Sequence, residues 1–78
     1  MIAWTWDSAA PDAQCCGVSD REDRAMAAAA AWMRAHHAAA ARAEPVRLDV
    51  VELAYIPAGR PILAARVGDS ITWRPAAL

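Results

Sequence analysis

The chain has 78 residues and a formal net charge of −1, and its 58% hydrophobic content is largely alanine. A chain this short hides only about 60% of the surface that its unfolded form exposes, and alanine buries little area, so we expect residues 1–78 to form a single domain with a thin core. A pI near 6.0 argues against a strong electrostatic grip on nucleic acid, because phosphate binding relies on clustered positive charge.

Neither a membrane segment nor a secretion signal is visible. The longest uninterrupted apolar run, residues 25–33, is shorter than the roughly 20 apolar residues that span a bilayer. The N-terminus carries an early acid, Asp7, and no basic segment, which is not typical of a signal peptide. We therefore expect a cytoplasmic protein.

The first predicted elements are a strand and a loop. Ile2, Trp4 and Trp6 alternate with smaller residues, which is the period of a half-buried strand. Residues 7–17 mix Ser, Pro, Asp, Gln and Gly without a period, so we expect a loop there.

An amphipathic helix is predicted over residues 19–43. Ser19 and Glu22 have the spacing of a capping box, which predicts that the helix begins at Ser19. One face collects alanines, methionines and Trp32, so Trp32 is expected to anchor this helix on a sheet. Pro45 is expected to end the helix, because the residue before a proline is disfavoured in the α region.

The second half of the chain has the pattern of strands and turns. Residues 46–56 read as a strand whose apolar phase changes at Val50 and Val51, which we interpret as a bulge. Residues 57–61 have turn chemistry, and strands are predicted at residues 62–67 and 71–74. The predicted fold is α+β in the order β-α-β-β-β, with one amphipathic helix packed on one face of a small antiparallel sheet.

Three segments, residues 19–25, 43–48 and 71–73, resemble strings found in short hypothetical proteins from actinobacteria. Those proteins combine a Trp-containing strand, a capped Ala/Arg helix and a β-meander that ends in Ile-Thr-Trp. The resemblance covers most of the chain from Ser19 onward and implies the same element order, but no activity. Members often carry a longer Arg-rich second hairpin, whereas Arg60 and Arg66 stand alone here, which weakens any nucleic-acid role that the resemblance implies.

The cysteines and histidines lack the spacing of metal sites. Cys15 and Cys16 are adjacent, so they cannot link distant segments and have no Cys-x2-Cys gap; we interpret them as reduced loop thiols. On a helix His36 and His37 diverge, and His36 follows Trp32 by one turn, so we expect it to stack on that ring. The alternative is a redox or metal role for the cysteines and a catalytic or metal role for the histidines. We predict no catalytic residue, no metal, no cofactor and no enzymatic activity.

A binding role follows from the predicted layers. One helix covers only one sheet face, and residues 46–56 place apolar side chains on both sides, so we expect a non-enzymatic interaction module, as a homodimer or with a protein partner. The expected edge strand is residues 71–74 or 2–6. The alternative is a nucleic-acid-binding accessory factor that stacks bases on aromatic rings beside arginines. The predicted interaction surface is Trp4, Trp6, Tyr55, Arg66, Trp73 and Arg74.

Overall fold

The computed structural model describes residues 2–76, which form one helix and six strands. In chain order these are β1 (Ile2–Ala10), β2 (Ala13–Ser19), α1 (Glu22–His36), β3 (Ala40–Asp49), β4 (Ala54–Pro57), β5 (Ile62–Val67) and β6 (Ser70–Pro75).

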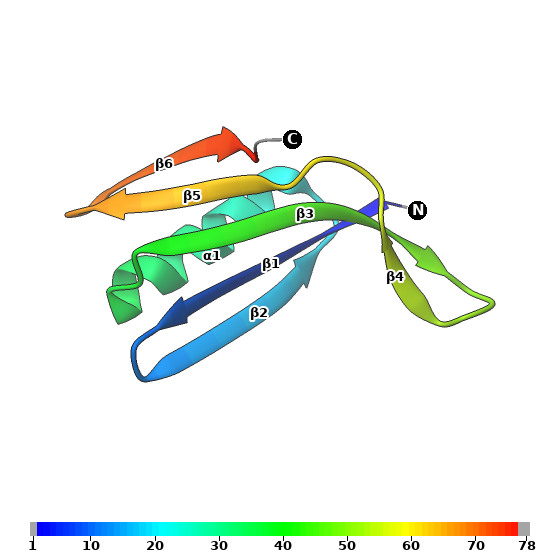
Figure 1. Ribbon diagram of the computed structural model, residues 1–78, viewed down its shortest axis with the longest axis horizontal. Coiled ribbons are helices and arrows are strands. Elements are labelled where there is room, and N and C mark those ends of the chain that lie inside the picture. The colour runs from blue at the N-terminus through cyan, green and yellow to red at the C-terminus, as the bar shows by residue number, and fades with distance from the viewer. Residues whose placement is uncertain (1, 77–78) are drawn as a thin grey trace.

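The strands form one antiparallel sheet, and α1 lies across one of its faces (Figure 1). The strand order is β2-β1-β3-β5-β6, and β4 pairs with β3 off this path. The predicted class, one helix on one face of a small antiparallel sheet, is confirmed. The chain has two strands more than the prediction, β2 and β4.

β3 is the longest strand and pairs with three neighbours. One of its edges pairs with β1. On the other edge its first half pairs with β5 and its second half with β4, so β4 and β5 follow each other along that edge. The outer end of the β3–β4 pair therefore has no third strand among residues 2–76, and Figure 1 shows it projecting past the end of the sheet.

The core lies between α1 and the sheet. Ala25, Ala29 and Met33 form the buried stripe of the helix, which packs on β1, β2 and β3. Met33 is the largest fully buried side chain in the described residues, and Trp6, only 8% exposed, lies in the same cluster. The other members of the cluster are alanines, so the core buries few methylene groups and is thin, as expected.

The helix is shorter than predicted at both ends. Its N-cap is Arg21, with no side-chain cap hydrogen bond, and Ser19 instead ends β2, opposite Trp4. At the other end His37 adopts the left-handed conformation, with φ of 57°, and the Ala38 amide donates to the Met33 carbonyl at 3.0 Å. This is the closing pattern of a Schellman motif. The predicted helical residues 40–43 belong to β3.

Other local predictions also need correction. The predicted loop 7–17 is a hairpin, because β1 continues to Ala10, residues 11–12 turn, and β2 returns. Trp32, which was expected to anchor the helix, is only partly buried, and Met33 is the residue that anchors it. β1 is an internal strand because β2 lies outside it, whereas β6 is the edge that was expected. The strands at 62–67 and 71–74 are confirmed. The predicted turn at 57–61 is wrong: Pro57 ends β4, and residues 58–61 connect β4 to β5 without reversing the chain, because both strands run antiparallel to β3.

Candidate interaction surface

Residues 48–55, called the arm from here on, form the projecting end of the β3–β4 hairpin. Leu48 pairs with Tyr55 and Asp49 with Ala54, so residues 50–53 make a four-residue loop. This loop stands where a strand bulge was predicted. The phase change was correctly located, but the chain reverses there instead of continuing.

Asp49 stabilises this reversal. Its carboxylate Oδ1 accepts hydrogen bonds from the Val51 amide at 2.9 Å and the Glu52 amide at 3.3 Å. Such bonds from an aspartate to the backbone ahead of it are a common turn device. Leu53 closes the loop with φ of 54°, a left-handed conformation that is uncommon for a residue other than glycine. The loop thus forms without any Gly, Pro or Asn.

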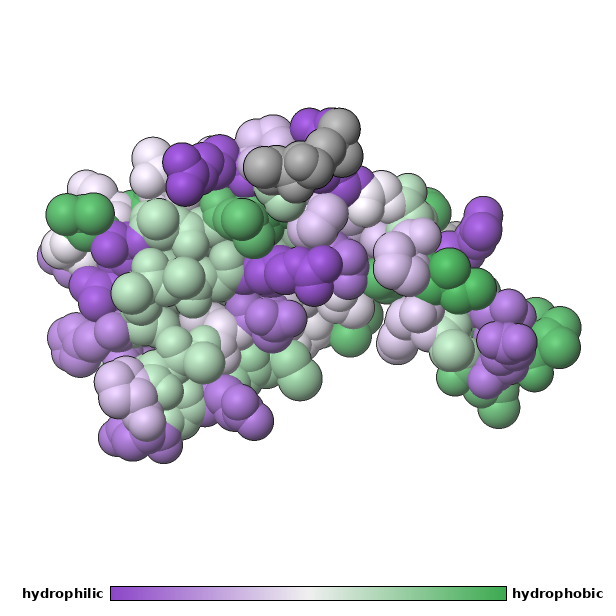
Figure 2. All heavy atoms as spheres, viewed as in Figure 1, coloured by the Kyte–Doolittle hydropathy of each residue, from purple (hydrophilic) through white to green (hydrophobic). Residues whose placement is uncertain are grey.

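The arm is apolar and its side chains are exposed. Val50 is 74% exposed, Val51 88% and Leu53 80%, and the cross-strand pair Leu48 and Tyr55 is half-exposed. In Figure 2 the arm is the right-hand lobe, with hydrophobic atoms at its outer end. Residues 2–76 thus leave these three tip side chains about three-quarters exposed or more.

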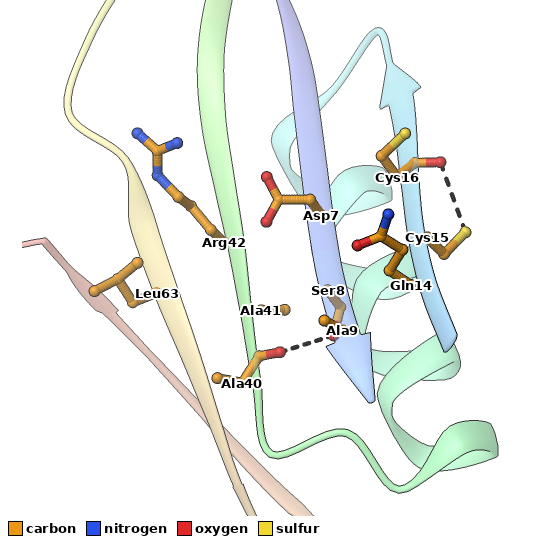
Figure 3. Close-up of a pocket in the computed structure, with 10 residues that line it drawn as sticks. All are labelled: Asp7, Ser8, Ala9, Gln14, Cys15, Cys16, Ala40, Ala41, Arg42 and Leu63. Atoms are coloured by element: carbon orange, nitrogen blue, oxygen red, sulfur yellow. Dashed lines mark hydrogen bonds between the residues drawn. The ribbon is translucent and has the colours of Figure 1, made fainter. Parts of the chain in front are cut away.

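A groove lies on the sheet face opposite α1, which we call the open face. Directly paired residues of neighbouring strands point to the same side, so the Asp7–Arg42 and Arg42–Leu63 pairs place these three side chains in one row (Figure 3). The groove has a volume of about 860 Å³ and is lined by Asp7, Ser8, Ala9, Gln14, Cys15, Cys16, Ala40, Ala41, Arg42 and Leu63.

Small residues make the floor of the groove. Ala9 and Ala40 both belong to the exposed side of their strands, and each offers only a methyl group. Beneath them the Ser8 hydroxyl donates to the Ala40 carbonyl at 2.7 Å (Figure 3), which fastens β1 to β3. The floor is therefore a rigid apolar surface, with Leu63 on one side and the edge strand β2 on the other.

A polar belt lies between the floor of the groove and the arm. We define it as Thr5, Asp7, Arg42 and Glu44, which pair across β1 and β3 on the open face. Asp7 and Arg42 also line the groove on this side. The Arg42 guanidinium Nη2 lies 3.0 Å from Glu44 Oε2, and Asp7 stands in register with Arg42. Figure 2 shows the order of these surfaces along the open face: pale hydrophobic atoms at one end, hydrophilic atoms across the middle, and then the arm.

The residues predicted to form one interaction surface are divided between different places. Trp6 is buried in the core, and Trp4 and Trp73 pack against that core. Tyr55 lies on the arm. The structure therefore does not bring the three tryptophans to the open face.

The two predicted arginines also lie apart. The Arg66 guanidinium donates to the carbonyls of Ala38 at 2.8 Å and Gly68 at 2.6 Å, so it holds backbone. Arg74 is exposed on β6, in register with Leu63 of the groove. Val50, Val51 and Leu53 were not predicted as surface residues, because an apolar run has the pattern of a buried strand. The sequence does contain one signal of a turn there, which is Asp49 next to the phase change.

The cysteines and histidines occupy ordinary positions. Cys15 packs against the core, and Cys16 is exposed at the groove. The His36 ring stacks on Trp32 with a centroid separation of 4.3 Å and an interplanar angle of 18°, which confirms the predicted contact. Among residues 2–76 no group of three His, Cys, Asp or Glu side chains could hold a metal ion. No helix in this part of the chain is long and apolar enough to cross a membrane.

Comparisons of the chain with protein-family models, with curated proteins and with solved structures found no match. The resemblance to short actinobacterial proteins therefore stays a prediction.

Proposed function

We propose that the protein is a small non-enzymatic protein-interaction module and that the arm is its binding element. One observation carries this proposal: Val50, Val51 and Leu53 form an apolar tip, each about three-quarters exposed or more, that residues 2–76 do not cover. Exposed apolar groups that cluster on a small protein are typical of interaction sites.

The tip supplies part of the free energy that binding requires. Fully burying a Val or Leu side chain contributes about 1.5 to 3 kcal/mol, so the three together offer about 5 to 9 kcal/mol. A micromolar complex needs about 8 kcal/mol net, and association itself costs at least about 4 kcal/mol. The tip alone therefore does not reach micromolar binding, and further contacts from the arm or the open face complete it.

The arm contributes little to the stability of its own chain. Its outer two residue pairs stand beyond β1 and β5, and a two-stranded hairpin by itself is at most marginally stable in water. A partner that covers the arm would supply the missing third side. Apolar side chains are thus concentrated where they do not build the core.

Two other classes of partner fit less well. Base stacking needs exposed rings, but Trp4, Trp6 and Trp73 pack on the core under α1, so we do not extend the proposal to nucleic acid. A lipid surface is disfavoured because Asp49 and Glu52 stand beside the apolar tip, and the headgroups of anionic lipids repel carboxylates.

Photo-cross-linking from the arm tests the proposal. A benzophenone amino acid in place of Val51 should give discrete protein adducts in cells of the source organism. The same probe in place of Ala31, which is exposed on α1 on the opposite side of the sheet, is the matched control and should not give them. Identical adducts from both positions, or none from position 51, would contradict the proposed role of the arm.

A further inference from the structure

We propose, on the basis of the function proposed above, that the partner of the arm is a second copy of this chain. In this arrangement the open faces of two copies meet about a two-fold axis, and the arm of each copy lies in the groove of the other. Four features of the structure lead to this pairing: the spacing along β3, the size of the groove, the opposite charges of the arm and the groove, and the presence of both surfaces on one face.

β3 carries the groove, the belt and the arm at equal intervals. Ala40 lies in the groove, Glu44 in the belt and Leu48 at the start of the arm. Each interval is four residues, about 13 Å at the rise of a β-strand. A two-fold axis that crosses β3 between the belt and the arm, near Val46, exchanges the tip of one copy with the groove of the other.

The groove fits the tip in size and in character. Its volume of about 860 Å³ lies within the range of about 300 to 1,000 Å³ found for sites that enclose a drug-sized molecule. The side chains of Val50, Val51 and Leu53 together occupy a smaller volume than a drug-sized molecule. The methyl floor of Ala9 and Ala40 leaves room for branched side chains, and Leu63 supplies an apolar wall.

The charges of the arm and of the groove are of opposite sign. The arm carries the carboxylates of Asp49 and Glu52. The groove is lined by Arg42 beside Asp7 and is flanked on the β6 side by Arg74. When the arm of one copy lies in the groove of the other, its carboxylates therefore approach guanidinium groups.

A second copy covers both apolar surfaces at once. An unrelated partner that held only the arm would leave the groove open, whereas reciprocal contact buries two arms and two grooves in one interface. Closed two-fold pairing is the commonest form of homo-oligomer. The pairing therefore buries two tips instead of one, and each tip binds a surface that the chain already presents.

Sedimentation velocity of the purified full-length chain is the first measurement. We expect a dimer at micromolar concentration, weakened by about tenfold or more in Val51→Asp because a carboxylate enters the apolar groove. Ala31→Asp, at an exposed position of α1 on the opposite side of the sheet, should dimerise as the parent does. Circular dichroism checks that both variants fold, which we expect because neither residue is in the core cluster.

Charge pairing between tip and groove gives a more specific measurement. Ala40→Arg should weaken the dimer on its own, and the double variant Val51→Asp, Ala40→Arg should recover it, because each new aspartate meets the partner's new arginine. Dimerisation through another surface predicts no recovery. A double variant that is as weak as either single variant would therefore overturn the arm-in-groove geometry.

Cys16 allows the contact to be trapped. It is exposed and lines the groove, so in a Cys15→Ser background Val51→Cys should form an intermolecular disulfide with it under a mild thiol oxidant such as diamide. Peptide mapping should find the link between positions 51 and 16, and Ala31→Cys, on the opposite side of the sheet, should not form it. A monomer at tens of micromolar, or a dimer linked elsewhere, overturns this inference.

The two proposals fail in different ways. A monomeric chain whose position 51 still cross-links to a different protein in cells would refute the second copy as partner and leave the interaction module standing. A chain that neither dimerises nor cross-links from position 51 would refute both.

Discussion

Gly17→Ala should destabilise the fold through one specific neighbour, the indole of Trp6. Gly17 pairs with Trp6 across β1 and β2. A Cβ at position 17 would meet the Trp6 Nε1 atom and lie 2.8 Å from its Cε2, closer than real Cβ contacts allow. Because Trp6 is only 8% exposed, its ring has little room to move away.

The expected cost is that of inserting a methyl group into a packed core, about 1 to 3 kcal/mol. A domain of this length has a free energy of unfolding of about 4 to 12 kcal/mol, so the change is measurable without unfolding the protein. In a Trp6→Leu background the clash disappears. There, alanine in a strand interior should be better than glycine by about 0.5 to 1 kcal/mol, so the sign of the effect reverses.

Urea unfolding followed by far-ultraviolet circular dichroism measures all four corners of this double-mutant cycle, and it does not depend on the fluorescence of Trp6. We expect a coupling energy of about 2 kcal/mol between positions 6 and 17. Gly68→Ala is the control: Gly68 has φ of 62° and no neighbour within 4 Å of an added Cβ, so its cost of about 1 to 2 kcal/mol should be the same in both backgrounds. Equal destabilisation by Gly17→Ala in both backgrounds would refute the reasoning.

Three further changes have expected outcomes. Met33→Ala should lower the free energy of unfolding by about 2 to 5 kcal/mol, measured by urea titration, because it empties the largest fully buried position. Ser19→Ala should change it by less than about 0.5 kcal/mol, because Ser19 ends β2 and caps no helix; a loss of a full kilocalorie would contradict this boundary. Asp49→Ala should speed amide hydrogen exchange at Val51 and Glu52 with little effect on global stability, since it removes their acceptor.

The layered α+β class could be predicted because it depends on the overall pattern of helical and strand segments, which does not change when individual boundaries are wrong. A stripe of alanine and methionine, followed by apolar strands separated by Gly and Pro turns, leaves few other arrangements for 78 residues. β5 and β6 were predicted closely because Pro61, Gly68 and Pro75 stand at or beside their ends.

The helix boundaries could not be predicted because tertiary pairing overrides local propensity. Residues 38–43 are all alanine except Arg42, and alanine favours helices. Yet β3 pairs with β1 on one edge and β5 on the other through residues 41–43. The signal for the helix end is His37, which takes a left-handed conformation without the glycine that usually marks one.

β2 was hidden because its inward residues are small. Cys15 and Gly17 face the helix side, in register with Ser8 and Trp6, so no apolar alternation appears in the sequence. Gly17 is small for a reason that only the structure shows: the Trp6 ring occupies the space of its side chain. A period-2 pattern depends on large inward residues, and in this hairpin only β1 has them.

The candidate site was predicted only in outline. An uncovered sheet face and Tyr55 as a surface residue follow from the sequence, but the tryptophans were placed on the wrong side of the sheet, because alternation alone does not say which face the helix covers. The exposed tip was hidden for the opposite reason: Val50, Val51 and Leu53 have the composition of a core strand.

Hydroxyl-radical footprinting of the arm, as a function of protein concentration, tests the central claim most directly. Leu53 and Tyr55 report on the arm, and His37 reports on an exposed residue at the end of α1. If the arm is the binding element, labelling of Leu53 and Tyr55 falls as the complex forms, with either a second copy or another partner, while His37 is labelled equally throughout. Labelling of the arm that stays at the level of the isolated chain, under conditions where the protein is associated, would contradict the account.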